Sequence, residues 1–239
     1  MRAFNALVSR EFKSYFNSPI AYIALLIFQI LPTLLFFGFG FFIRGLASYQ
    51  NYFFWAQMIY IILIPALTMR SWAEEKRQRT DEILVTLPYS EWSLVLAKYC
   101  AALLLLLVAI VLTFFLPLTT IWLGNFDLKI LIGQYFGIIL LGALGVSLGI
   151  FISSLCKNQI TAFLVTVIIL FLMLALWPLL QMVSMPQFIA KVIAFFSFSA
   201  HFDSFSRGLM SSKDIIYFVG ISFLFIYLTV MVIRFRKYN

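Results

Sequence analysis

The residues best suited to binding chemistry lie in one charged internal stretch, residues 71–98, between long apolar segments. The stretch holds five of the nine acids and four of the seventeen lysines and arginines: Glu74, Glu75, Asp81, Glu82, Glu91, Lys76, Arg77, Arg79 and Lys98. Charges of both signs on a short segment suit docking to a soluble partner, and a solvated connector is the plainer alternative. The stretch therefore predicts a docking surface and leaves the connector open.

His201, Asp203 and Arg207 form the second group of candidate residues. A hydrolytic or metal site needs several convergent ligands, and His201 is the sole histidine, with no cysteine nearby. We therefore expect no catalytic residue and no metal ligand. A hydrogen bond from His201 to Asp203, or a position at the membrane interface, is the preferred interpretation. Asp203 and Arg207 have the (i, i+4) spacing of an ion pair on one helix face.

Two other kinds of chemistry lack the residues they need. The sequence has no Walker A motif, so we expect no ATP or other cofactor bound by this chain. Ionisable residues are missing from the middle of its apolar segments, and proton- or sodium-coupled carriers and intramembrane proteases depend on such groups. An enzyme and a secondary carrier are both disfavoured.

The elements that position these residues must be membrane helices. Of the 239 residues, 64% are hydrophobic and 11% are charged, and the mean hydropathy is +1.04. A soluble domain cannot bury so much apolar surface, and backbone groups in lipid must bond internally. We predict an all-α integral membrane protein that forms a single domain over residues 1–239. Six spans are expected, at residues 20–43, 52–70, 95–123, 131–155, 159–181 and 215–234.

The basic residues set the expected orientation. With six spans and both termini in the cytoplasm, twelve of the seventeen lysines and arginines lie inside. The five outside are Arg44, Lys129, Lys191, Arg207 and Lys213. This positive-inside bias predicts that both termini lie in the cytoplasm. We expect a multi-pass protein of the bacterial inner membrane. It also accounts for the formal charge of +8 without a nucleic-acid partner.

An amphipathic helix is expected over residues 3–16, before the first span. Apolar residues recur there at helical spacing with polar residues opposite, which suits a helix lying in the headgroup layer against membrane lipid. Its candidate functional residues are Arg10, Glu11, Phe12 and Lys13. Ser18 and Pro19 then predict the start of the first span, as N-cap and first helical residue.

The charged stretch predicts a second short helix, beginning at Ser71 on the cytoplasmic surface. Ser71 and Glu74 have the spacing of a capping box. Glu75 precedes Arg79 by four residues, the favourable order for an ion pair within a helix.

The end of this short helix is expected to be apolar. Ile83, Leu84 and Leu87 give it an apolar edge, which can seat in a groove on a partner, and Pro88 ends it. Ser90 is then the expected N-cap of the third span.

The fourth span contains five glycines, some at small-xxx-small spacing: Gly133, Gly137, Gly142, Gly145 and Gly149. Such spacing lets helices approach closely in lipid. Packing within the chain is the preferred interpretation, and a substrate path or a dimer contact is the alternative.

The segment between the fifth and sixth spans, residues 183–214, is expected on the outer side. It is too apolar for a free loop, so we predict an external re-entrant hairpin of short helices packed on the bundle.

The stretch from Thr68 to Pro88, TMRSWAEEKRQRTDEILVTLP, resembles the cytoplasmic loop of ABC-2-type permeases. That loop has an acidic–basic run, then Thr-x-Glu, aliphatic residues and a closing proline. The matching positions are Thr80, Glu82, Ile83, Leu84 and Pro88. Residues 11–19, EFKSYFNSP, and residues 196–208 are similar to the gliding-motility-type and nitrous-oxide-accessory branch of that family.

The resemblance implies a permease subunit of an ATP-driven transporter, performing export or conformational work. Two such chains, identical or different, would bind two ATP-binding subunits, which hold the ATP and Mg²⁺. Residues 3–16 would be the elbow helix, and the first and fifth spans would line the dimer interface. Residues 71–91 would form the coupling loop, with Glu74, Glu75, Arg79, Thr80, Glu82, Ile83, Leu84, Leu87 and Pro88 serving the ATPase contact.

Several alternatives remain open within this interpretation. A membrane anchor or scaffold could dock a soluble partner through residues 71–91 without transport. The nitrous-oxide branch suggests copper at His201, although a local hydrogen bond is preferred there. A periplasmic or membrane auxiliary protein is a further candidate partner, and the substrate and its direction of movement are undetermined.

Overall fold

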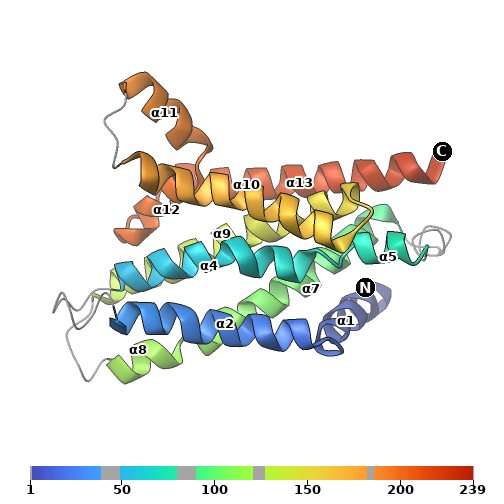
Figure 1. Ribbon diagram of the computed structural model, residues 1–239, viewed down its shortest axis with the longest axis horizontal. Helices are drawn as coiled ribbons and strands as arrows, with labels where there is room; N and C mark the ends of the chain where they lie inside the picture. The colour runs from blue at the N-terminus through green and yellow to red at the C-terminus, as the bar shows by residue number, and fades with distance from the viewer. Residues whose placement is uncertain (1, 39–48, 80–89, 121–126, 182–185, 239) are drawn as a thin grey trace.

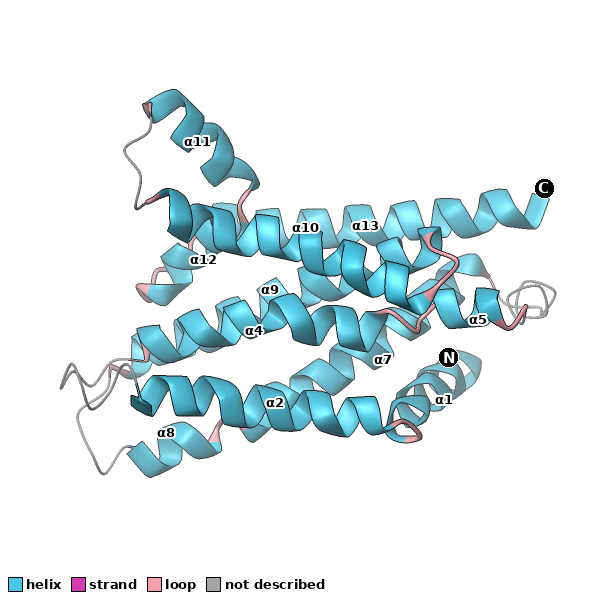
Figure 2. Ribbon diagram, viewed as in Figure 1, coloured by secondary structure: helices cyan, strands magenta, loops and turns pink. Residues whose placement is uncertain are grey.

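The computed structural model describes residues 2–38, 49–79, 90–120, 127–181 and 186–238, and these residues form helices joined by turns (Figure 2). Within these ranges, six helices are long and apolar enough to cross a membrane. They are α2 (Pro19–Phe36), α4 (Gln50–Thr68), α7 (Glu91–Leu112), α9 (Leu128–Leu155), α10 (Gln159–Leu180) and α13 (Ser212–Tyr238). The prediction of an all-α membrane protein with six spans is confirmed.

Four of the other five spans, α4, α7, α10 and α13, pack against α9 (Figure 1). Of the apolar 18-residue stretch of α9, 72% is buried inside the molecule. The same fraction is 22% for α10 and for α13, and 28% for α2. Because lipid solvates apolar side chains as well as other helices do, the outer faces of these three helices can remain apolar. Burial therefore concentrates on α9 and on α4 beside it.

Serine caps fix the starts of two spans where the sequence predicts them. Ser18 is the N-cap of α2, with its Oγ accepting from the Ile20 N–H at 3.3 Å, and Pro19 is the first helical residue. Ser90 caps α7 and accepts from the Ser93 N–H at 3.2 Å. The first span was expected to reach residue 43; helix α2 ends at Phe36, and residues 39–48 lie outside the described part.

The third span differs from the expected 95–123. Helix α7 begins at Glu91 and ends at Leu112, and a separate short helix, α8 (Phe115–Thr120), follows. Pro117 has no N–H to donate to the carbonyl of Thr113 four residues earlier, so the helical ladder cannot continue through this point. The Thr113 hydroxyl instead donates to the Ile110 carbonyl at 2.6 Å. Residues Glu91–Thr119 together remain long and apolar enough to be one span, so the described part of the predicted span consists of two helical segments, and residues 121–126 lie outside the described part.

The glycines of α9 serve packing within the chain, which confirms the preferred interpretation. A methyl group added at Gly145 would meet the side chain of Ile64, and one added at Gly149 would meet the side chain of Thr68, both in α4. Only residues without a side chain allow α4 and α9 to lie this close.

Besides α8, four shorter helices complete the described part, one of them α5 (Ala73–Arg77) after α4. Helix α1 (Arg2–Phe16) precedes the first span and packs on α7 and α2. Between the fifth and sixth spans lie α11 (Gln187–Phe196) and α12 (Phe198–Ser206), bent by 84° at Ser197. Helix α12 buries Phe198, Phe202 and Phe205 in the bundle, whereas α11 buries no residue and projects from it (Figure 1). The expected packing on the bundle is therefore extensive for α12, whereas α11 contacts α10 and hydrogen-bonds to Tyr217 of α13 near its end.

Candidate functional site

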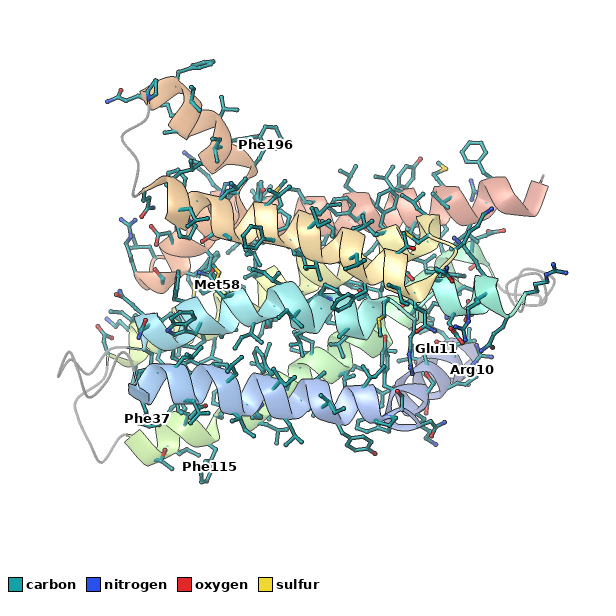
Figure 3. The ribbon with its side chains drawn as sticks, viewed as in Figure 1. Arg10, Glu11, Phe37, Met58, Phe115 and Phe196 are labelled. Atoms are coloured by element: carbon teal, nitrogen blue, oxygen red, sulfur yellow. The ribbon has the colours of Figure 1, made fainter. Side chains whose placement is uncertain are left out.

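The N-terminal helix and the start of the charged stretch meet at one end of the bundle. Helix α5 (Ala73–Arg77) follows α4 after a turn and lies at the same end as α1 (Figure 1). Arg10 and Glu11 of α1 lie beside it (Figure 3). The first turns of α7 reach the same region because α1 packs along α7.

Lys98 joins these three helices through two ion pairs. Its Nζ lies 3.2 Å from Glu11 Oε2 of α1 and 2.5 Å from Glu75 Oε1 of α5. We call Lys98, Glu11 and Glu75 the Lys98 network. It links residues 87 and 23 positions apart in sequence, so it fixes α1 and α5 against α7 directly.

The network is largely shielded from water. The Lys98 side chain is 4% exposed and the two glutamate side chains are 17% exposed. The Lys98 Nζ also lies 5.0 Å from the centre of the Trp72 ring, within the range of a cation–π contact. A buried ammonium flanked by two carboxylates and an indole is well compensated, and loss of Lys98 would remove the cation that both carboxylates share.

Glu11 is held ionised by its neighbours. Burial raises the pKa of the Glu11 carboxyl, but the Lys98 ammonium and the Arg10 guanidinium, 2.8 Å from Glu11 Oε1, lower it more. The net pKa lies below the usual value. The stabilisation from Glu11 is therefore complete above the ordinary carboxyl pKa and is lost as the pH falls through the lowered one.

Helix α5 is anchored by α9 rather than by its own sequence. The Ser153 Oγ of α9 accepts from the N–H groups of Trp72 and Ala73, at 3.1 and 3.2 Å. Lys76 donates to the carbonyl of Ser154 and, at 3.2 Å, to that of Cys156. The predicted capping box is therefore wrong: the helix begins at Ala73, and a serine from another span satisfies its first donors.

The helix expected over residues 71–87 is short in the described part. Helix α5 ends at Arg77, and Arg79 has a φ of 55°, outside the helical region. The predicted Glu75–Arg79 pair is wrong because Glu75 pairs with Lys98, while Glu74 contacts Arg77 and Gln78. The other predicted coupling residues lie outside the described part: Thr80, Glu82, Ile83, Leu84, Leu87 and Pro88.

A second polar cluster lies at the opposite end of the bundle. His201 Nδ1 lies 2.7 Å from Asp214 Oδ1 in α13, and its Nε2 lies 3.2 Å from the Phe195 carbonyl of α11. The ring stacks on Tyr217 with centres 3.7 Å apart. The predicted hydrogen bond from His201 to Asp203 is therefore wrong. The predicted ion pair between Asp203 and Arg207 is present, at 2.6 Å.

Replacing His201 with phenylalanine is expected to loosen α11. The variant keeps a ring to stack on Tyr217 but loses both polar contacts, at a cost of roughly 1–3 kcal/mol where a buried carboxylate is left unpaired. Amide hydrogen exchange over residues 187–196 should become faster. The exposed Asp203–Arg207 pair supplies the control, since Arg207→Gln should change exchange little. Unaltered exchange in His201→Phe contradicts this anchoring role.

Comparison with known families identifies the protein class. Residues 44–235 match the family described as ABC-2 family transporter protein, from just before α4 into α13. The chain belongs to the ABC-2 transporter family. No curated protein matches it. An ABC-2 chain is a membrane-spanning transporter component and not itself the catalytic part.

Sequence reasoning missed several residues that join α1, α5 and α7 in this ABC-2 chain. Lys98 was placed in the charged stretch without a role, yet it is the centre of the network. A lysine that begins an apolar run signals a partner, because a charge at that depth needs compensation. Ser153 and Trp72 gave no comparable signal, since their contacts depend on how α9 packs beside α4.

Proposed function

We propose that this ABC-2 protein is the permease subunit of an ATP-driven transporter and that a separate ATP-binding subunit docks on residues 71–91. The complex would hold two ATP-binding subunits and lie in the bacterial inner membrane, with both termini in the cytoplasm. In support, α1, α5 and the C-terminal end of α13 lie at the same end of the bundle (Figure 1). The positive-inside bias assigns this end to the cytoplasm.

The Lys98 network is the observation that carries the proposal. It connects the loop that would contact the ATPase to the start of a membrane span, through a charge that is almost wholly buried. A displacement of α5 therefore has to move α7 and α1 or break a buried ion pair. A transporter needs such a connection if closure of its ATP-binding subunits is to move the membrane spans.

A second permease copy is also proposed. Helices α2 and α10, on either side of α4, show broad apolar faces with side chains more than half exposed. These include Ile23, Leu26, Leu34, Ile160, Leu164 and Ile168. Both helices are those that the family resemblance places at the dimer interface. Crosslinking between cysteines introduced at Leu26 or Leu164 would distinguish a partner copy from lipid.

Placement in the gliding-motility and nitrous-oxide-accessory branch remains a proposal based on residues 11–19 and 196–208. The proposed elbow function of α1 is supported by its position beside α5 and its contact with Lys98. We propose no metal role for His201, whose two ring nitrogens face a carboxylate and a carbonyl.

The direct test is to purify the tagged protein from its native membrane in mild detergent and identify its partners by mass spectrometry. We expect a stoichiometric P-loop ATPase whose ATP hydrolysis depends on the permease. If crosslinking through residues 71–98 captures a partner that binds equally with and without nucleotide, the scaffold replaces the transporter.

Charge reversal at two exposed arginines should weaken docking without unfolding the bundle. Arg77 and Arg79 lie beyond the Lys98 network and are solvent-exposed. Arg77→Glu with Arg79→Glu should reduce co-purification of the ATPase, because partner charges facing them would become repulsive. Lys213→Glu, an exposed change at the opposite end, is the matched control. Equal ATPase recovery in both variants argues against docking at this loop.

A further inference from the structure

Helix α11 forms one wall of a cavity of about 430 Å³ at the end of the bundle opposite the Lys98 network. Lys191, Ala194 and Phe195 of α11 line this cavity, together with Trp177 of α10 and residues of α12. Helix α11 buries no residue of its own, so few contacts hold the wall in place. Figure 3 labels Phe196 at the end of α11 nearest the bundle, where side chains from α12 and α13 reach the helix.

Two side chains from other helices contact the last carbonyl groups of α11. His201 Nε2 lies 3.2 Å from the Phe195 carbonyl, and the Tyr217 hydroxyl donates to the Phe196 carbonyl at 2.9 Å. Carbonyls in the last turn of an α-helix have no partner within the helix, so these contacts supply what the helix itself cannot. A phenol keeps its proton up to about pH 10, whereas histidine changes charge between about pH 5 and 8. Of the two contacts, the one made by His201 is therefore sensitive to pH.

Both ring nitrogens of His201 face oxygen atoms that accept hydrogen bonds. Nδ1 lies 2.7 Å from Asp214 Oδ1, and Nε2 faces the Phe195 carbonyl. Neutral imidazole has one N–H and one lone pair, so it satisfies one acceptor and turns its lone pair toward the other, whereas imidazolium donates to both. The same count holds if Asp214 carries the proton, because its O–H then donates to Nδ1 and Nε2–H remains for the carbonyl. The arrangement therefore needs one proton more than a neutral ring beside an ionised carboxylate.

The contact that fails without this proton is the one to α11. A carboxylate is a stronger acceptor than a carbonyl, and the contact with Asp214 is the shorter of the two. The neutral ring therefore keeps its hydrogen on Nδ1, and the Nε2 lone pair of His201 faces the carbonyl oxygen of Phe195. These two electron-rich atoms repel each other, and the bond from Tyr217 is the one that remains of the pair.

The other charged groups around the ring leave Asp214 as its partner. Within the cavity, α11 supplies Lys191, and α12 supplies Asp203 and Arg207, which pair with each other at 2.6 Å. Helix α10 contributes an uncharged tryptophan, and α13 adds two aromatic rings besides Asp214. The side chains of His201 and Asp214 are 18% and 10% exposed, so water has little access to replace either contact.

We propose that His201 and Asp214 form a proton-operated latch for α11. Uptake of one proton fastens the end of α11 to α12 and α13, and loss of that proton releases it and opens one wall of the cavity. The proton is exchanged with water at this end of the bundle, which faces the outside of the cell under the proposed orientation. That choice of side rests on the proposed function, and the latch itself does not.

The test uses the full-length protein in lipid nanodiscs, without an ATPase and with a purification tag that contains no histidine. Amide hydrogen exchange over residues 187–196 is measured at about pH 5 and about pH 8, as protection relative to the intrinsic exchange rate at each pH. Because a hydrogen bond to a charged group is lost at the higher pH, protection should fall roughly tenfold there. Exchange in α9 is the internal reference for an intact fold. Equal protection of α11 at both pH values, or greater protection at the higher one, overturns the proposal.

The single histidine of the chain gives a direct view of the proton. In NMR spectra of protein carrying ¹⁵N-labelled histidine, Nε2 of His201 should bear a hydrogen at the lower pH and lose it at the higher pH, while Nδ1 takes the remaining hydrogen. This change should have the same midpoint as the change in α11 exchange. An Nε2 that stays in one state at both pH values contradicts the latch.

Matched carboxylate variants separate the latch from a general effect of pH. In Asp214→Asn the amide nitrogen can donate to Nδ1, so a neutral ring keeps Nε2–H for Phe195 and α11 should stay protected at both pH values. Asp203→Asn makes the same change beside Arg207 and should keep the full pH response. Tyr217→Phe should lower protection by a similar factor at both pH values, because its bond does not involve the histidine proton. A pH response that survives in Asp214→Asn rules out this pair as the latch.

Discussion

Lys98→Met is expected to destabilise the protein strongly and, under the proposed function, to uncouple it from the ATP-binding subunit. Methionine keeps a similar length but leaves Glu11 and Glu75 facing each other without the ammonium that lies 3.2 and 2.5 Å from them. Removing one partner of a buried ion pair costs roughly 3 kcal/mol or more. We expect a lower thermal unfolding temperature in detergent, and loss of permease-dependent ATP hydrolysis in the reconstituted complex.

Two further variants separate the network from a general effect of removing a lysine. Lys213→Met, at an exposed position of the opposite end, should stay within about 0.5 kcal/mol of the parent. The triple variant Lys98→Met, Glu11→Gln, Glu75→Gln should regain most of the stability, because neutral groups no longer carry an unpaired charge. It should remain uncoupled if the ion pairs transmit the movement. A Lys98→Met protein as stable and as well coupled as the parent would remove the network from the mechanism.

Gly149→Val is expected to disrupt the contact between α4 and α9. A side chain at Gly149 would collide with that of Thr68, which is fully buried and donates its hydroxyl to the Ile64 carbonyl at 2.9 Å. Overpacking a well-packed core costs about 1–3 kcal/mol, and two branched carbons facing one neighbour place this variant at the upper end. Folded yield and unfolding temperature in detergent should both fall.

Position-matched variants test the steric origin of this effect. Gly220 of α13 has open space where its side chain would be, so Gly220→Val should be tolerated. Combining Gly149→Ala with Thr68→Ala should be better tolerated than Gly149→Ala alone, since the second change removes the nearest colliding atom, Thr68 Oγ1, together with Cγ2, and leaves only Cβ in close contact. If Gly149→Val and Gly220→Val prove equally stable, close approach of α4 and α9 is not needed for folding.

The spans were predictable because the bilayer imposes a simple rule. An apolar run of about 20 residues must form a helix in lipid, whatever its neighbours are. Ser18 and Ser90 were predictable for a similar reason, since each caps a helix through contacts only two or three residues away. The break after Leu112 could have been found from Pro117, whose missing N–H acts within one turn.

The candidate site was less predictable because its contacts are tertiary. Local spacing predicts that Glu75 pairs with Arg79 and that Ser71 and Glu74 cap the helix. In the structure Glu75 forms an ion pair with Lys98, and Ser153 accepts the hydrogen bonds at the start of α5. His201 likewise hydrogen-bonds to Asp214 of α13 and not to Asp203 of its own helix. In each case a residue brought near by the packing of spans is a better-placed partner than the one on the same helix, and a single sequence carries no trace of that geometry.

The anchoring of α5 on three sides decides how mechanical load would spread through the molecule. The chain connects α5 to α4, Ser153 connects it to α9, and Lys98 connects it to α7. A pull at this point is therefore shared at once by half of the spans, including the most buried one. The bundle should respond by tilting as a block rather than by sliding one helix past its neighbours.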